Sequence, residues 1–237
     1  MTISTSTTSS AFDAYANGYD AALEQGLSVS GEGKNYFAHG RIAWLQGALQ
    51  KLKFQPDSAV DFGCGTGSAT PFLFDVLGIS SVLGLEVSSK SREVAEQMHG
   101  SERARFLLFE QYKPAGTIDL AFCNGVFHHI PPQQRASSVD YVFRCLRPGG
   151  LFALWENNPW NPGTRLVMSR IPFDKDAITL TPPETRRTLR ASGFEVLRTD
   201  FLFIFPHILK WLRWTEPMVS RLPLGAQYMV LGRKPVG

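Results

Sequence analysis

The stretch Ala59-Val60-Asp61-Phe62-Gly63-Cys64-Gly65-Thr66-Gly67-Ser68 decides the fold predicted for this chain of 237 residues. A short apolar run ends at an acidic residue, three glycines then alternate with small residues, and helical apolar spacing resumes at Ala69. This order predicts a strand, a tight loop and a helix. Glycines can adopt positive φ angles, and they place no Cβ atom between the loop and a ligand. The stretch therefore predicts that a ligand binds against bare backbone.

The spacing of the glycines and of two acidic residues narrows the chemistry of that ligand. The loop reads G-x-G-x-G with Asp61 two residues before Gly63, whereas a dinucleotide-binding loop reads G-x-G-x-x-G and holds a pyrophosphate. A preceding carboxylate favours a ligand that carries an amine or a sulfonium over one that carries a phosphate. Nineteen residues after Gly67, Glu86 ends a second apolar run, Ser81–Leu85, where a carboxylate can accept both hydroxyls of a ribose. The predicted ligand is a nucleoside.

Four segments, in order, resemble the successive motifs of class I S-adenosylmethionine-dependent methyltransferases. They are Val60–Gly67, Gly84–Ser88, Ile118–Ile130 and Leu146–Gly150, within a match between residues 55 and 155. The resemblance implies an α/β fold, a Rossmann-like three-layer sandwich with a seven-stranded, mostly parallel sheet whose last strand is antiparallel. It also implies S-adenosylmethionine as the cofactor and, from residues 124–127, the branch of the family that methylates small molecules.

The residues predicted to bind the cofactor lie in these motifs and in the segment before them. In the family that segment caps the cofactor, so Tyr36, Phe37 and Arg41 are candidates for closing the site, with ordinary packing against a helix as the alternative. The family often places an acidic residue near Glu110 to accept the adenine amino group, with a solvated loop carboxylate as the alternative. The predicted cofactor-binding residues are Tyr36, Arg41, Asp61, Gly63, Cys64, Gly65, Gly67, Glu86, Val87, Glu110, Asn124 and Gly125.

The length of the chain predicts one domain with additions. Residues 1–10 are predicted to form a disordered tail, and residues 11–237 a single methyltransferase domain in which residues 11–55 are an N-terminal cap. Residues 157–181 and 206–225 are predicted to be substrate or lid insertions, because turn-forming residues dominate the first and the second separates the last two strands.

Three titratable residues are candidates for catalysis. Methyl transfer from a sulfonium is an in-line displacement, which needs alignment and, only where the acceptor must lose a proton, a base. His128 or His129 could deprotonate a hydroxyl, and Glu156, just after the predicted strand Leu151–Trp155, is the alternative base or substrate-orienting group. For the histidines the other interpretation is packing or backbone contact with the cofactor, and for Glu156 it is a structural or capping role. Adjacent residues point in different directions, so at most one histidine is expected to face the acceptor and no metal site is predicted.

Residues 207–216, between the predicted strands Phe194–Phe205 and Gln227–Gly232, are predicted to form an inserted helix. At about 100° per residue, its aromatic and aliphatic side chains cover one broad side and its charges the other. One interpretation is a lid over an apolar pocket or a contact in a homodimer, and the other is peripheral contact with an anionic membrane surface. The chain has a net charge of +3, and residues 151–237 alone carry 12 Lys and Arg against 7 Asp and Glu, a net +5. Solvated surface explains this excess, and attraction of an anionic substrate or membrane is the alternative.

The predicted function is S-adenosylmethionine-dependent methylation of a small-molecule or lipid-like acceptor in the cytoplasm, with peripheral attachment to a membrane left open. Nucleic acid is not expected as the acceptor, because no clustered aromatic and basic stripe is visible and no Asn-Pro-Pro-Tyr motif follows the predicted strand Ile118–Cys123. The rival is a non-catalytic domain that binds the cofactor as a scaffold or partner protein. A nicotinamide-dependent oxidoreductase is a third candidate, which the glycine spacing disfavours.

Overall fold

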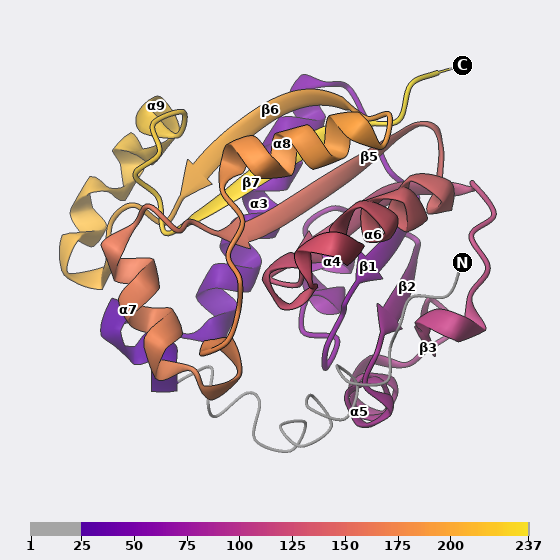
Figure 1. Ribbon diagram of the computed structural model, residues 1–237, viewed down its shortest axis with the longest axis horizontal. Coiled ribbons are helices and arrows are strands. Elements are labelled where there is room, and N and C mark those ends of the chain that lie inside the picture. Colours follow the sequence, from indigo (N-terminus) through magenta and orange to yellow (C-terminus); the bar gives the residue numbers. More distant parts are fainter. Residues whose placement is uncertain (1–24, 237) are drawn as a thin grey trace.

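The computed structural model describes residues 25–236, in which seven strands form one sheet (Figure 1). The strands are β1 (Ser58–Phe62), β2 (Ser81–Glu86), β3 (Ala104–Leu108), β4 (Ile118–Asn124), β5 (Leu146–Asn157), β6 (Glu195–Leu202) and β7 (Gln227–Arg233). Their order across the sheet is β3-β2-β1-β4-β5-β7-β6, and β7 is antiparallel to both of its neighbours. The predicted α/β fold with a reversed last strand is confirmed. The predicted tail, residues 1–10, and residues 11–24 of the predicted cap lie outside the described residues.

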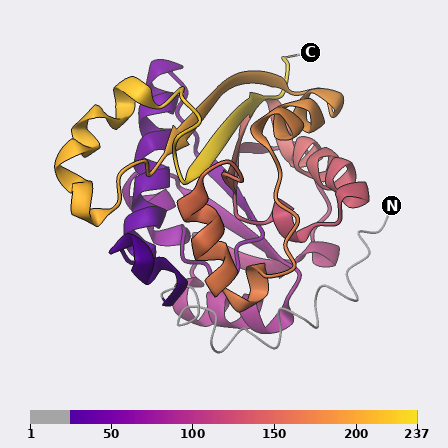
Figure 2. The same ribbon diagram turned by 60° about the vertical axis from the view of Figure 1, so that its left-hand side comes forward.

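Helices cover both faces of the sheet and complete three layers (Figures 1 and 2). Within residues 25–236, five helices pack on the sheet, namely α3 (Lys34–Lys51), α4 (Thr70–Asp75), α5 (Ser89–His99), α6 (Pro132–Cys145) and α8 (Pro182–Ala191). Ile42 of α3 and Leu73 of α4 share one apolar core, and Val139 of α6 and Leu189 of α8 share the other. α5 packs Ala95 against β3. Each apolar stripe of a helix is therefore buried on a sheet whose strands are themselves apolar on both faces.

Shorter elements connect these layers. They are η1 (Ser28–Ser30), η2 (Phe109–Gln111), η3 (Phe127–His129), α7 (Pro162–Arg170), η4 (Pro172–Asp174), η5 (His207–Thr215) and α9 (Glu216–Val219). η3 follows β4, α7 and η4 lie between β5 and α8, and η5 and α9 lie between β6 and β7.

The strand order reverses between β1 and β4, and this reversal positions the candidate site. In a parallel sheet of this kind, ligands bind outside the carboxyl ends of the strands beside the point of reversal. The glycine loop follows β1, Glu86 ends β2, Asn124 ends β4, and Glu156 lies one residue before the end of β5. The topology therefore gathers residues that are up to 93 positions apart in the chain, from Gly63 to Glu156, at one edge of the sheet.

The predicted strand Phe194–Phe205 is wrong at its C-terminal end, because β6 ends at Leu202. Phe203 adopts a φ of +61°, which turns the backbone out of the extended conformation. The backbone N–H groups of Ile204 and Phe205 then donate to Oε1 of Glu216, at 3.2 and 3.1 Å, instead of to a strand.

The predicted regular helix over residues 207–216 is also wrong in its geometry. Residues 207–215 are 3₁₀-helical with a kink at Leu209, whose φ is −108° and ψ 22°. A 3₁₀-helix has about three residues per turn, so residues three apart line up on one side. Ile208, Trp211 and Trp214 have this spacing and are 83%, 67% and 75% exposed. We call these three residues the apolar ridge, and it belongs to a segment that stands out from the body of the molecule beside α9 (Figures 1 and 2).

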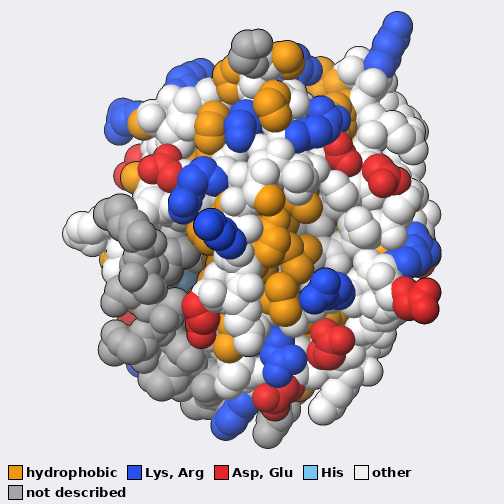
Figure 3. Space-filling view, turned by 90° about the vertical axis from the view of Figure 1, so that its right-hand side faces the viewer, with side chains coloured by type: hydrophobic (Ala, Val, Ile, Leu, Met, Phe, Trp, Pro, Cys, Tyr) orange, Lys and Arg blue, Asp and Glu red, His pale blue; other side chains and the backbone are white. Residues whose placement is uncertain are grey.

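The opposite side of the molecule has a different surface. On the described part of the face in Figure 3, Lys and Arg side chains alternate with Asp and Glu around a narrow apolar strip. Charges of both signs are therefore mixed on the side away from the apolar ridge. Within residues 25–236, the helices are too short or too polar to cross a membrane.

Candidate functional site

A cavity of about 450 Å³ opens at the carboxyl edge of the sheet, where the glycine loop, the end of β4 and the connecting segments meet. The segments flanking the sheet also contribute to its wall, with Phe37 from α3, Met168 from α7 and Pro206 before η5. Most of the predicted site residues line it. They are Tyr36, Arg41, Asp61, Gly63, Cys64, Gly65, Asn124, Gly125, His128 and His129.

The glycine loop has the backbone that its sequence predicts. Gly63, Gly65 and Gly67 adopt φ angles of +72°, +55° and +77°. A Cβ atom on Gly63 would lie 2.5 Å from a methyl group of Val126, so only glycine allows this close approach of the two loops. The N–H of Gly63 donates to the carbonyl oxygen of Leu85 at 2.8 Å, which fixes the loop to the end of β2.

Glu86 holds the other side of this loop. Its Oε2 accepts the N–H of Gly65 at 2.8 Å, and its Oε1 accepts the N–H groups of Val87 and Ser88 at 2.9 and 3.1 Å. The side chain is buried and is turned toward these amides, and it does not form part of the cavity wall. The carboxylate therefore shapes the loop, and its contact with a ribose stays a prediction.

Three more of the predicted cofactor-binding residues lie outside the cavity wall. Gly67 and Val87 face neighbouring parts of the protein, with Gly67 against Phe106 and Val87 against the core under α6. Glu110 is exposed in η2. A direct contact of Glu110 with a ligand in this cavity is not supported by its position.

Asp61 brings a buried carboxylate to the cavity. Its pKa is raised to about 7, first because burial disfavours the charged form and second because Glu86 is negative, while Arg41 acts in the opposite direction. Arg41 itself is anchored by a hydrogen bond from Nη1 to Oε1 of Gln227, at 2.8 Å. A cationic ligand group beside Asp61 would favour its charged form, so this part of the cavity suits an ammonium or a sulfonium.

Asn124 supplies an acceptor at the end of β4. Its Oδ1 atom is buried and has no hydrogen-bond partner among the described residues, although the residue lines the cavity. A buried amide oxygen of this kind costs free energy unless a ligand donates to it. Asp61, the glycine loop and Asn124 together therefore fit a ligand with several hydrogen-bond donors and a positive charge.

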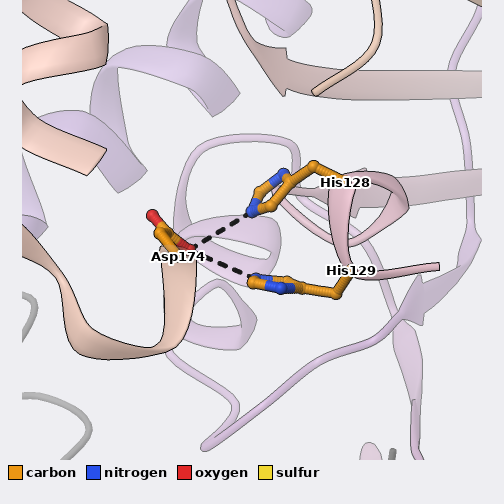
Figure 4. A group of neighbouring side chains, drawn as sticks. All are labelled: His128, His129 and Asp174. Carbon is orange, nitrogen blue, oxygen red and sulfur yellow. Dashed lines mark ion pairs between the residues drawn. The ribbon is translucent and has the colours of Figure 1, made fainter. Parts of the chain in front are cut away.

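His128 and His129 converge, contrary to the prediction from sequence (Figure 4). Their ring centroids are 4.1 Å apart, and both Nε2 atoms face Oδ1 of Asp174, at 3.4 and 3.3 Å. The prediction assumed that neighbouring side chains diverge, but η3 is 3₁₀-helical and brings both rings to one side. A carboxylate also stands beside both rings, because η4 supplies Asp174.

Glu156 lies behind His128, away from the cavity. Its Oε2 is 2.6 Å from Nδ1 of His128, its Oε1 accepts the N–H of Phe127 at 2.7 Å, and the side chain is fully buried. The prediction that Glu156 is a base or directly orients an acceptor is therefore corrected, because both oxygens are engaged and neither faces the cavity. Glu156 instead contacts the ring of His128 from behind.

The charged groups in this cluster shift one another's pKa values. Burial alone would lower the pKa of His128, but the carboxylates of Glu156 and Asp174 outweigh it and raise that pKa to about 10. Burial lowers the pKa of His129, and the neighbouring His128 adds to this effect against the opposing Asp174. Burial would raise the pKa of Asp174, but the two histidines beside it lower that pKa to about 2.

Asp174 is the member of this cluster that the sequence did not indicate. It is 45 positions beyond His129, in a loop rich in turn formers, so no fixed spacing connects it with the histidines. The composition of residues 157–181 indicated that this segment lies over the site, but it did not indicate which of its residues contacts the histidines. Asn161 and Thr164 of the same segment line the cavity too.

The sheet order, the glycine loop after β1 and the acidic residue at the end of β2 define the class I S-adenosylmethionine-dependent methyltransferase fold. Residues 60–152 match the family model described as a methyltransferase domain. Residues 60–152 therefore carry a methyltransferase domain, and the fold is that of the class I S-adenosylmethionine-dependent methyltransferases, a class whose cofactor is S-adenosylmethionine.

Comparisons with individual proteins agree on the fold. The chain is 27% identical over 115 residues to trans-aconitate 2-methyltransferase of Azoarcus sp. (strain BH72), covering 48% of this chain and 45% of that protein. It is 26% identical over 113 residues to cyclopropane-fatty-acyl-phospholipid synthase of Escherichia coli (strain K12), covering 47% and 29%. The chain thus matches less than half the length of these relatives. A methyltransferase structure from Thermotoga maritima superposes with a TM-score of 0.64 at 19% identity, covering 95% of this chain and 99% of that one.

Proposed function

We propose that this protein transfers the methyl group of S-adenosylmethionine to a small-molecule or lipid-like acceptor bound in the same cavity. The observation that carries the proposal is that one cavity joins two chemically different walls. One wall has the glycine loop, Asp61 and Asn124, and the other has the histidines and Asp174. A methyltransferase needs this arrangement, because the two reactants must be held in line within one site.

The half of the cavity proposed to bind the cofactor has side chains and backbone that complement the cofactor's polar groups. Asp61 would face the ammonium group of the cofactor, the glycine loop would bring backbone against it, and Oδ1 of Asn124 would accept from one of its donors. Tyr36 and Arg41 would close the same half from α3. When bound, S-adenosylmethionine supplies an electrophilic methyl group, so the protein's own contribution is to align the acceptor and to exclude water.

The acceptor half of the cavity is mainly apolar. Its wall includes Val167, Met168 and Ile171 from the segment around α7, and Phe203 and Phe205 after β6. The two relatives named above act on a polar acid and on a lipid by their names, and this apolar wall favours the lipid-like end of that range for this chain. His129, the more exposed of the two histidines, would contact the reacting end of the acceptor.

A test of methyl transfer separates this proposal from a non-catalytic cofactor-binding scaffold. We expect labelled methyl groups to pass from S-adenosylmethionine into an extracted pool of lipids and small acids in the presence of the full chain. His129→Ala should lower that transfer while leaving the affinity for S-adenosylhomocysteine unchanged, and His39→Ala, an exposed change on α3, is the matched control. Cofactor binding without transfer into any acceptor pool would support the scaffold.

The apolar ridge supports delivery of the acceptor from a membrane surface. Its two tryptophans and one isoleucine are exposed next to Lys210, and Pro206 and Arg213 of the same segment line the cavity. Tryptophans at an interface with nearby cations suit an anionic lipid surface. Flotation with anionic vesicles tests this, with Trp211→Ala/Trp214→Ala as the variant. If the wild-type chain stays in the soluble fraction at low salt and sediments as a dimer, the ridge is a contact between two copies instead.

A further inference from the structure

We propose that His128, His129 and Asp174 form a binding site for a divalent transition-metal ion, with Glu156 positioning the first histidine (Figure 4). Each of the three residues offers one ligand atom, and these atoms all lie within 4.8 Å of one another. Two imidazole nitrogens and one carboxylate oxygen are a donor set that binds zinc, iron and cobalt.

The distances fit ligands of one ion better than close ion pairs. Oδ1 of Asp174 is 3.4 Å from Nε2 of His128 and 3.3 Å from Nε2 of His129. Charged N–H···O hydrogen bonds are commonly about 2.7 to 2.9 Å long. Two ligands that are each about 2.1 Å from a tetrahedral ion lie about 3.4 Å apart. An ion can therefore be placed between these atoms with little movement of the backbone.

The support behind His128 is the kind found behind metal-binding histidines. Glu156 engages Nδ1 at 2.6 Å, so Nε2 is the nitrogen that points into the cluster. The backbone N–H of Phe127 fixes the other oxygen of Glu156. A carboxylate on the far nitrogen orients the ring and raises its strength as a ligand.

The negative charge of the cluster and its opening to the cavity also favour a bound metal ion. Glu156 and Asp174 place two carboxylates in a cluster whose four side chains are at most 14% exposed. His128 would release its proton on binding a divalent cation, and the cation with two neutral imidazoles would then balance both negative charges. The three ligand residues line the cavity, so a fourth position of a tetrahedral ion would be open to it. If the proposed methyl transfer is correct, an oxygen atom of the acceptor would take that position.

The experiment measures metal binding by the full chain without an acceptor. After treatment with a chelator and dialysis, the protein is titrated with Co²⁺, and the visible absorption and the heat of binding are followed. We expect one ion per chain, displaced by Zn²⁺. Asp174→Asn and His129→Ala should each weaken Co²⁺ binding by about tenfold or more, and Glu156→Gln by about 10- to 100-fold.

Two measurements keep the result independent of folding and of the proposed activity. His39→Ala, which removes an exposed histidine outside the cluster, should leave Co²⁺ binding unchanged. Calorimetry with S-adenosylhomocysteine shows that each variant is folded and reports on the cofactor half alone. The proposal is overturned if the wild-type chain binds S-adenosylhomocysteine but no Co²⁺, or if Asp174→Asn and His129→Ala bind Co²⁺ as the wild type does.

Discussion

Replacing Glu86 by glutamine tests whether the acidic end of β2 is required for cofactor binding. The carboxylate accepts three backbone N–H groups, one from Gly65 on Oε2 and two from Val87 and Ser88 on Oε1. A carboxamide keeps one acceptor oxygen and replaces the other by a donor. At least one N–H group must then face a donor, or the loop must move away from it.

The size of the effect follows from the burial of these groups. A buried N–H group left without a partner costs about 1–3 kcal/mol. If the loop relaxes to avoid this cost, binding must restore its shape, and the dissociation constant of S-adenosylhomocysteine should rise by about 5- to 150-fold. The Tm should fall by about 2–4 °C for each kcal/mol that the folded state loses.

Isothermal titration calorimetry with S-adenosylhomocysteine measures the first effect, and a thermal melt measures the second. Glu93→Gln is the matched control, because this carboxylate lies on α5 with its side chain 58% exposed and should change neither quantity. An unchanged dissociation constant in Glu86→Gln refutes the argument that this carboxylate shapes the cofactor loop, even if the Tm falls.

Three further predictions concern the same edge of the sheet. Burial raises the pKa of Asp61 to about 7, and a cationic ligand group needs the charged form of this carboxyl. The affinity for S-adenosylhomocysteine should therefore fall about tenfold between pH 8 and pH 6, and calorimetry should show no such change in Asp61→Asn. Gly63→Ala should abolish measurable binding, because its Cβ would meet Val126 at 2.5 Å, and adding Val126→Ala should restore part of the affinity. His128→Ala leaves the buried Glu156 without its partner and should lower the free energy of unfolding by about 3–5 kcal/mol in urea melts; a loss below 1 kcal/mol would contradict the buried ion pair.

The order of the elements around the glycine loop could be predicted because local patterns determine it. Residues 59–68 alternate small and apolar residues in a way that suits a strand, a turn with positive φ angles and a helix, and the structure has each of these. Ser88 caps α5 through a contact of the same local kind, because its hydroxyl accepts the N–H of Ser91 at 3.1 Å. Such features depend on neighbours within a few residues.

The cluster of His128, His129 and Asp174 could not be predicted in this way. Its geometry depends on a 3₁₀ turn over residues 127–129 and on the path of the loop that carries Asp174, and neither leaves a periodic signal. Glu86 shows a second limit, because its position was predicted but its three bonds to backbone were not. A sequence places a carboxylate at the end of a strand without showing which way the side chain turns.

The reversed direction of β7 has a consequence for how this protein could diversify. Because β7 is antiparallel to β6, the connection between them leaves the sheet and returns to it at the same edge, beside the cavity. A parallel final strand would need a crossover to the far edge before it could begin. The middle of this connection, residues 206–219, can therefore change in length without a shift in strand register, whereas its end is tied to β6 because the N–H of Phe201 donates to the carbonyl oxygen of Ser220 at 2.7 Å. Change in this one loop is the simplest route by which chains with the same cofactor half could acquire different acceptors.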